Sequence, residues 1–172
     1  QDIIALDNVK APGWAASESY RYLGSEDISK DRYISADFAR GEFERMWTRT
    51  WQMACREEHI PESGDYYVYD IGPFSFIVTR CEDGSIKAHF NACLHRGTKL
   101  KPSHTSGFAN DLRCPFHGWT WNLDGSLKDV PERWDFPHIS GKAMCLPEAR
   151  VAVRGGFVFI NMDADAPSLE DY

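Results

Sequence analysis

Two short pairs of residues in this sequence could bind metal. Cys93 and His95 form a Cys-x-His pair, and Cys114 and His117 form a Cys-x-x-His pair. Each pair places one thiol and one imidazole on a short stretch of chain. Two thiolates and two imidazoles suit one tetrahedral metal ion, or a two-iron cluster in which cysteines bind one iron and histidines the other. The sequence therefore predicts a metal centre built from Cys93, His95, Cys114 and His117.

A zinc ribbon is the chemical alternative, because two cysteines and two histidines are also a zinc ligand set. Zinc modules favour a Cys-x2-4-Cys pair followed by a His-x3-5-His pair. Here each pair supplies one cysteine and one histidine, which favours the two-iron cluster. Gly97 and Gly118 follow the two histidines, and glycine lets the backbone turn back closely. We expect these turns to leave N–H groups free to face cluster sulfurs.

The remaining cysteines and histidines have no partner at ligand spacing. Three cysteines stand beside apolar or turn residues and are predicted to be structural: Cys55, Cys81 and Cys145. Four histidines are predicted to lie on the surface or in satisfied core positions: His59, His89, His104 and His138. Arg96 is open to two interpretations, an ion pair or part of a docking face for an electron donor. Trp119 is predicted to pack against the loop that holds the ligands.

The elements that must position the two pairs are mainly short strands. Alternating apolar residues predict a β-hairpin at 67–71 and 74–78. Further strands are predicted at 85–91, 111–113, 120–122, 127–129, 151–154 and 157–160. Ser35 is a predicted N-cap for an amphipathic helix over 37–51, and a second helix is predicted to start at Ser168. We therefore expect a mainly β, antiparallel domain preceded by an irregular arm and one helix.

Composition excludes several classes of protein. The 172 residues suit one domain, and 42% hydrophobic with 26% charged residues is typical of a globular chain. A formal net charge of −7 disfavours binding to nucleic acid. No apolar run approaches the roughly 20 residues of a membrane helix, and no leader peptide opens the chain. With five scattered cysteines, these features predict a cytoplasmic protein with no membrane partner.

The residues around the two pairs resemble a known family. Cys93-Leu-His-Arg-Gly and Cys114-Pro-Phe-His-Gly-Trp are similar to the Rieske [2Fe-2S] motif of aromatic-ring-hydroxylating oxygenase α subunits. The similarity extends upstream through Gly41-Glu-Phe-Glu-Arg-Met-Trp and Ile60-Pro-Glu-Ser-Gly-Asp-Tyr. It implies a Rieske-type β domain with two cluster-binding loops. The implied division is an N-terminal arm at 1–34, a Rieske domain at 35–161 and the start of a linker at 162–172.

The resemblance also implies roles and partners. Cys93 and Cys114 would bind the inner iron, and His95 and His117 the outer iron that is reduced. Electrons would come from a ferredoxin or flavin reductase and pass to a mononuclear Fe(II) site. Only one histidine follows the two pairs, so we expect that site in an absent catalytic domain, reached in a neighbouring subunit of an α3-type oligomer. The alternative is a stand-alone Rieske ferredoxin.

The resemblance further bears on the redox potential. High-potential Rieske proteins carry an extra cysteine in each loop, forming a disulfide, and a serine hydroxyl aimed at the cluster. The matching places here hold Thr98, Phe116 and Trp119. We therefore expect a potential at the low end of the range of roughly −150 to +300 mV.

Overall fold

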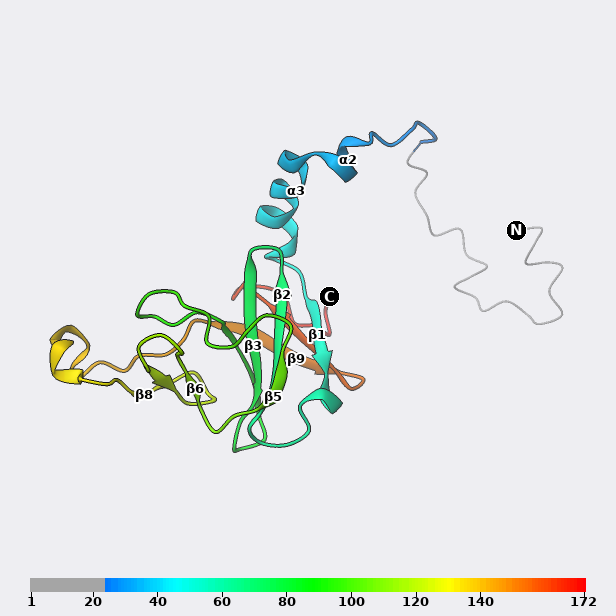
Figure 1. Cartoon of the computed structure of the whole chain (residues 1–172). Helices are drawn as coiled ribbons and strands as arrows, with labels where there is room; N and C mark the ends of the chain where they lie inside the picture. Colours follow the sequence, from blue (N-terminus) through cyan, green and yellow to red (C-terminus); the bar gives the residue numbers. More distant parts are fainter. Residues whose placement is uncertain (1–23) are drawn as a thin grey trace.

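The N-terminal part of the described chain is helical. The computed structural model describes residues 24–172, so most of the predicted arm lies outside the described residues. A short helix that was not predicted, α2 (Asp31–Ile34), precedes α3 (Ala36–Glu42), which continues as a π-helical turn over Phe43–Trp47. Ser35 caps α3 as predicted, because its hydroxyl accepts a hydrogen bond from the Phe38 N–H at 3.3 Å. Figure 1 shows both helices standing beyond one end of the sheet.

The helix is shorter than the predicted 37–51 because Trp51 belongs to the body of the domain. The Trp51 side chain is buried, and its indole N–H donates to the Pro167 carbonyl at 3.0 Å. The chain therefore leaves the helix before Trp51 and enters the first strand of the large sheet directly after it. At the other end, the helix predicted to start at Ser168 is only a turn, in which the Asp171 N–H donates to the Ser168 hydroxyl at 3.3 Å.

A seven-stranded antiparallel sheet forms the body, in the order β1-β10-β9-β4-β3-β2-β5. Five of its strands lie where the sequence predicts them: β2 (Asp65–Ile71), β3 (Phe74–Arg80), β4 (Ile86–Phe90), β9 (Glu148–Arg154) and β10 (Phe157–Asn161). The two edge strands were not predicted: β1 (Gln52–Arg56) and β5 (Ser106–Phe108). Strand β1 has an irregular register between Met53 and Cys55, and β5 is exposed throughout, so neither shows a clean alternation.

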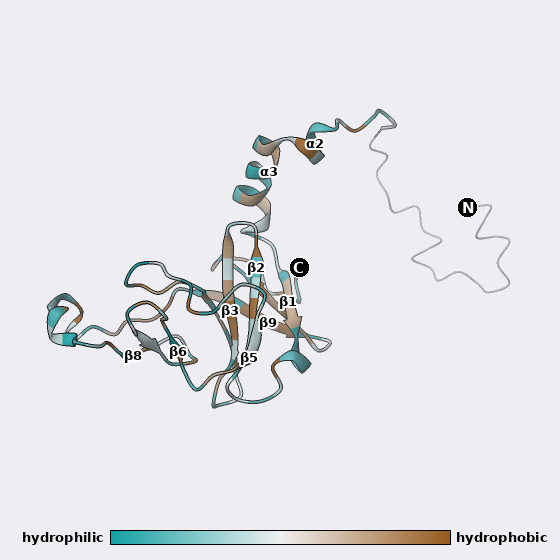
Figure 2. Cartoon of the chain, in the orientation of Figure 1, coloured by the Kyte–Doolittle hydropathy of each residue, from teal (hydrophilic) through white to brown (hydrophobic). Residues whose placement is uncertain are grey.

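The core lies on both faces of this sheet. On β3, Ile77 packs into a cluster that also contains Cys93 and Cys114, whereas Phe76 and Val78 pack into a second cluster on the opposite face. All three β3 side chains are fully buried, and Figure 2 shows much of β3 as hydrophobic. Because successive strand residues alternate between faces, a strand buried on both sides reads as a continuous apolar run.

A second, three-stranded sheet carries one of the two cysteine-histidine loops. Its strands lie where the sequence predicts strands: β6 (Leu112–Arg113), β7 (Thr120–Trp121) and β8 (Leu127–Asp129). Their order in the sheet is β6-β7-β8. Leu112 and Trp121 belong to the same buried cluster as Ile77. The small sheet is therefore packed on the face of the large sheet that holds both cysteines of the predicted metal centre.

His89 on β4 differs from its prediction, because it is a core histidine without a hydrogen-bond partner. It is 0% exposed, and neither ring nitrogen has a partner among the described residues. Burial lowers the pKa of His89, and Lys87 acts in the same direction, while Glu148 and Asp124 act against it. The folded protein therefore favours a neutral imidazole at this position.

This burial predicts a loss of stability in mild acid. The unfolded chain binds a proton at His89 more tightly than the folded protein does, with an unfolded pKa of about 6.5. Neutral His89 therefore contributes fully to the free energy of unfolding above that pH. As the pH falls toward the lower pKa of the folded protein, the free energy of unfolding decreases by up to about 1.4 kcal/mol per pH unit. Urea unfolding at several pH values should show this slope in the wild type and not in His89→Phe. The exposed His104→Gln should keep the wild-type slope, and a His89→Phe protein that also keeps it would contradict the assignment.

Candidate metal centre

The first cysteine-histidine loop follows β4 and is closed by backbone hydrogen bonds. The Cys93 N–H donates to the Thr98 carbonyl at 2.9 Å, and the Gly97 N–H donates to the Cys93 carbonyl at 2.8 Å. The buried Asn91 fixes the return of the chain, because its side-chain oxygen accepts from the N–H groups of residues 100 and 101 at 2.9 and 3.0 Å. Sequence reasoning did not single out Asn91, since no motif marks it.

The second loop joins β6 to β7 and repeats this pattern. The Cys114 N–H donates to the Trp119 carbonyl at 2.8 Å, and the Gly118 N–H donates to the Cys114 carbonyl at 3.1 Å. Both loop glycines have positive φ, +72° and +70°, which side chains rarely adopt. The N–H groups of these two glycines donate to the cysteine carbonyls, so they are not among the N–H groups left free for cluster sulfurs. The backbone N–H of His95 instead lowers the pKa of the Cys93 thiol.

The two loops bring the four predicted ligands together as two pairs. Cys93 and Cys114 are only 2% and 4% exposed, and both are free thiols. Burial raises the pKa of Cys93, and the nearby Cys114 raises it further, while the His95 N–H and the Trp121 side chain lower it. The imidazoles of His95 and His117 lie beside each other, with ring centroids 4.7 Å apart. His95 is half-buried and His117 is exposed, so the sulfurs lie inside and the imidazoles at the surface.

The donor atoms fit a two-iron cluster. Nδ1 of His95 is buried and has no hydrogen-bond partner among the described residues, which leaves it available to bind metal. Within residues 24–172, no three Cys, His, Asp or Glu side chains converge as ligands of a single ion. Two sulfurs and two imidazoles held as separate pairs suit two irons with two protein ligands each better than one tetrahedral zinc.

Aromatic side chains hold His95 in place. The Trp119 indole stacks on the His95 ring with centroids 5.1 Å apart and an interplanar angle of 8°. Phe136 meets both rings edge-on, at 5.5 Å from His95 and 5.3 Å from Trp119. The predicted packing of Trp119 against the loops is confirmed. Phe136 was missed because it comes from a later segment with no spacing that relates it to the ligands.

A comparison with known families decides the identity of this arrangement. The sequence model of the Rieske [2Fe-2S] domain matches residues 50–146, which is more than half of the chain and includes both loops. The chain belongs to the Rieske [2Fe-2S] domain family. The mainly β, antiparallel fold and the [2Fe-2S] cofactor predicted from the sequence are thereby confirmed.

The relatives of this Rieske chain include oxygenase α subunits. It is 37% identical over 141 residues to chlorobenzene dioxygenase subunit alpha of Cupriavidus sp. (strain PS12), covering 81% of this chain and 31% of the relative. It is 32% identical over 166 residues to biphenyl 2,3-dioxygenase subunit alpha of Rhodococcus jostii (strain RHA1), covering 95% of this chain and 36% of the relative. The chain spans about a third of the length of these relatives. The matches favour neither the stand-alone ferredoxin nor the zinc module.

Solved structures give the same result. Naphthalene 1,2-dioxygenase from Rhodococcus sp. bound to indole superposes with a TM-score of 0.73 at 38% identity, over 78% of this chain and 31% of that one. A quaternary ammonium Rieske monooxygenase in complex with L-carnitine superposes with a TM-score of 0.76 at 30% identity, over 83% and 40% of the two chains. Within residues 24–172, no helix has the length and apolar character needed to cross a membrane.

The other candidate residues lie outside the two predicted ligand pairs. Cys55 and Cys81 are buried as expected of structural cysteines, whereas Cys145 is exposed, with its sulfur 3.7 Å from the Asp124 carbonyl. Arg96 is exposed and forms no ion pair with a residue in the described part of the chain. Burial lowers the pKa of His95, and the charges of His117 and Arg96 lower it further.

Three of the four remaining histidines are on the surface. They are His59, which stacks on Tyr67 with centroids 5.4 Å apart, His104 and His138. Their predicted positions are confirmed, and none of the three joins the ligand pairs.

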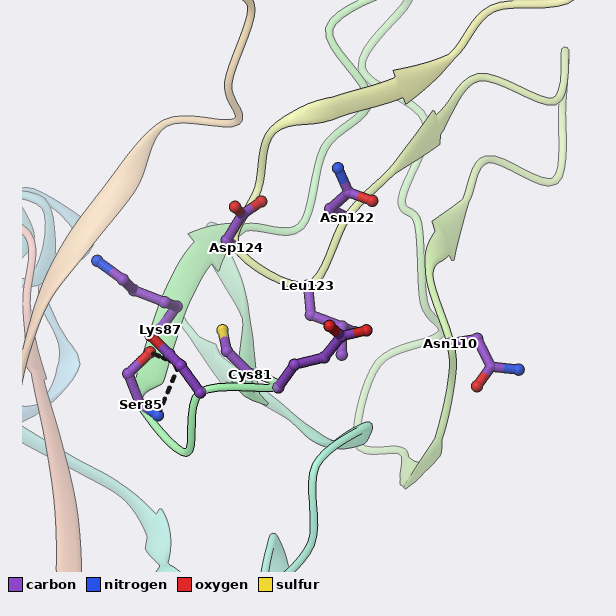
Figure 3. A pocket seen from close by; sticks show the side chains of 9 residues that line it. Cys81, Ser85, Lys87, Asn110, Asn122, Leu123 and Asp124 are labelled. Atoms are coloured by element: carbon purple, nitrogen blue, oxygen red, sulfur yellow. Dashed lines mark hydrogen bonds between the residues drawn. The ribbon is translucent and has the colours of Figure 1, made fainter.

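A pocket of about 650 Å³ lies between two turns and contains none of the four predicted ligands. Figure 3 shows Cys81, Lys87 and Asp124 around it. Its acidic groups stabilise the turns themselves. Oδ1 of Asp124 accepts from the N–H and the hydroxyl of Ser126 at 2.9 and 2.6 Å, and Asp83 makes the same two contacts with Ser85. We therefore assign this pocket to the hairpin turns and not to the chemistry of the protein.

Proposed function

We propose that this chain is the electron-transfer domain of a ring-hydroxylating oxygenase α subunit. Cys93 and Cys114 would bind one iron of the Rieske cluster, and His95 and His117 the other. The observation that carries this proposal is the arrangement of the four side chains, with two buried thiols and two imidazoles that lie beside each other. The relatives named above are oxygenase α subunits, which supports the assignment.

When bound, a Rieske cluster accepts and passes on one electron at a time. The protein supports this by holding its ligands in fixed positions. The buried thiols keep water away from the sulfur side, and Trp119 fixes the plane of the His95 ring by stacking on it. His117 is exposed, so its imidazole edge offers a route for an electron to leave at the surface. Protonation of the outer edges of the imidazoles would accompany reduction.

The domain boundaries and partners belong to the same proposal. The matched region, 50–146, lies inside a Rieske domain that we place at 35–161, with an arm at 1–34 and a linker from 162 onward. A ferredoxin or flavin reductase in the cytoplasm would supply electrons, and exposed Arg96 is a candidate contact for it. The electron would then pass to a mononuclear iron in a catalytic domain of a neighbouring subunit, where an aromatic substrate is hydroxylated.

The redox potential tests this function. Two neutral imidazoles in place of two thiolates raise the potential of a [2Fe-2S] cluster above that of ferredoxins with four cysteines. Since no loop cysteine pair or serine donor is present in the matching places, spectroelectrochemistry should give a midpoint at the low end of roughly −150 to +300 mV. A midpoint well above zero would contradict the role as an acceptor from a ferredoxin or flavin reductase.

A further inference from the structure

Two polar side chains outside the first cysteine-histidine loop hold the segment that closes it. This segment, residues 99–104, follows Thr98, whose carbonyl accepts the Cys93 N–H at 2.9 Å. Asn91, directly after β4, fixes its first half. The Asn91 side-chain oxygen accepts from the N–H groups of residues 100 and 101, and its side-chain N–H donates to the carbonyl of residue 101 at 2.8 Å. Asn91 is 2% exposed, so these bonds are shielded from water.

Asp70 on β2 holds the second half of the same segment. Its Oδ2 accepts from the His104 N–H at 3.1 Å, and its Oδ1 accepts from the Ser103 hydroxyl and from Nζ of Lys99, both at 3.3 Å. His104 has a φ of +57°, which non-glycine residues seldom adopt, and the bond to Asp70 helps to hold it there. Burial by itself raises the pKa of this carboxyl, but the contacts with its partners outweigh burial and lower the pKa. Asp70 is therefore a charged acceptor for this segment.

Ser75 on β3 connects the two side chains. It lies opposite Asp70 in the register of β2 and β3, and its hydroxyl accepts from the Asn91 side-chain N–H at 3.1 Å. A hydroxyl that accepts one hydrogen bond can donate another, and the Ser75 hydroxyl is one of the groups that lower the pKa of Asp70. Three polar side chains thus form one row from β2 to the start of the first loop. Polar groups linked in this way inside a protein strengthen one another.

We propose that Asp70 is a positioning residue for the first ligand pair and slows the loss of iron from it. Through Ser75 and Asn91, its carboxylate acts on the whole of residues 99–104, and this segment in turn keeps the first loop closed. Supporting contacts outside the ligands fix the ligands in place, and a ligand pair that is fixed keeps its metal longer. The inference rests on the proposed function, and it adds a residue from a strand that carries neither loop.

Residue-resolved amide hydrogen exchange of the cluster-containing protein tests this coupling. Asp70→Asn keeps the size of the side chain but removes its charge, and hydrogen bonds to a charged acceptor are about twice as strong as neutral ones. The N–H groups of residues 100 and 101, which bond to Asn91 and not to Asp70, should exchange about tenfold faster. Release of iron to a chelator should speed up by about the same factor. The reduced protein should also give a broader paramagnetic resonance signal, because the first ligand pair then takes a wider spread of positions.

Asp83→Asn is the matched control. Oδ1 of Asp83 also accepts from an N–H and a hydroxyl, those of Ser85, but it lies in the turn after the far end of β3. Exchange at residues 100 and 101, iron release and the width of the signal should equal those of the wild type. Asp70→Glu keeps the charge and should return most of the protection that Asp70→Asn loses.

Faster exchange at residue 104 alone in Asp70→Asn, with wild-type iron release, would overturn the inference, because Asp70 would then act only on its direct partner. Equal effects of Asp83→Asn and Asp70→Asn would overturn it too. If Asp70→Asn does not fold, Lys99→Gln removes the charged partner of the same carboxylate, and unchanged exchange at residues 100 and 101 then contradicts the coupling. A wild-type protein without a cluster would overturn the proposed function, while the exchange rates would still decide whether Asp70 holds the segment.

Discussion

Protein carrying Cys93→Ala or Cys114→Ala is expected to bind no cluster. Each substitution removes one of two thiols that are buried side by side, and the described residues nearby offer no third cysteine or carboxylate that could replace it. A cluster iron left with one protein ligand is open to exchange with solvent. Iron and acid-labile sulfide should fall from the stoichiometric level of a [2Fe-2S] protein to background, and the visible absorption should disappear.

The matched control is Cys145→Ala. Cys145 is a free thiol outside the two loops, and it is exposed, so its loss should leave iron, sulfide and colour unchanged. Circular dichroism of each purified variant separates loss of the cluster from loss of the fold. Wild-type iron content in a folded Cys93→Ala protein would contradict the ligand assignment.

Gly125→Ala is expected to be strongly destabilising. Gly125 has φ +83°, and an added Cβ would lie 2.4 Å from Cε1 of the His89 ring. The ring is fully buried and cannot move aside. Left-handed backbone costs about 1–2 kcal/mol and overpacking about 1–3 kcal/mol, so the free energy of unfolding should fall by about 2–5 kcal/mol.

Gly84→Ala separates these two costs. Gly84 occupies the same place in an Asp-Gly-Ser turn and has φ +81°, but an added Cβ there meets nothing within 4 Å. Urea unfolding should therefore show a loss of only about 1–2 kcal/mol for Gly84→Ala. Equal losses in the two variants would show that the contact with His89 contributes nothing.

Much of the fold could be predicted because local patterns and the final packing agree. The hairpin of β2 and β3 has alternating apolar residues and a Gly-Pro turn, and its strands lie next to each other in the large sheet, between β4 and β5. Strands β1 and β5 were missed because their positions depend on partners far away in sequence. Strand β1 pairs with β10, and the fully exposed β5 pairs with β2. An edge strand is held by its neighbour, so its own residues carry little of the signal.

The candidate site, like the fold, could be predicted only in part from the sequence. The ligand pairs were predictable because metal chemistry restricts both residue type and spacing, as at Cys93 and His95. The residues that hold them in place were not. Asn91 acts through hydrogen bonds to residues 100 and 101, Phe136 reaches the site from a later segment, and Trp121 lies in the buried cluster that contains Cys93. Such contacts arise from the tertiary structure, and no local spacing in the sequence indicates them.

The paramagnetic resonance spectrum of anaerobically purified protein, recorded before and after reduction with dithionite, tests the central claim most directly. The oxidised protein should be silent, because the two ferric irons are coupled. Reduction should produce the anisotropic signal of a [2Fe-2S] cluster with two histidine and two cysteine ligands, and His117→Ala should abolish it. A colourless wild-type protein that stays silent on reduction and contains zinc in place of iron would contradict the account.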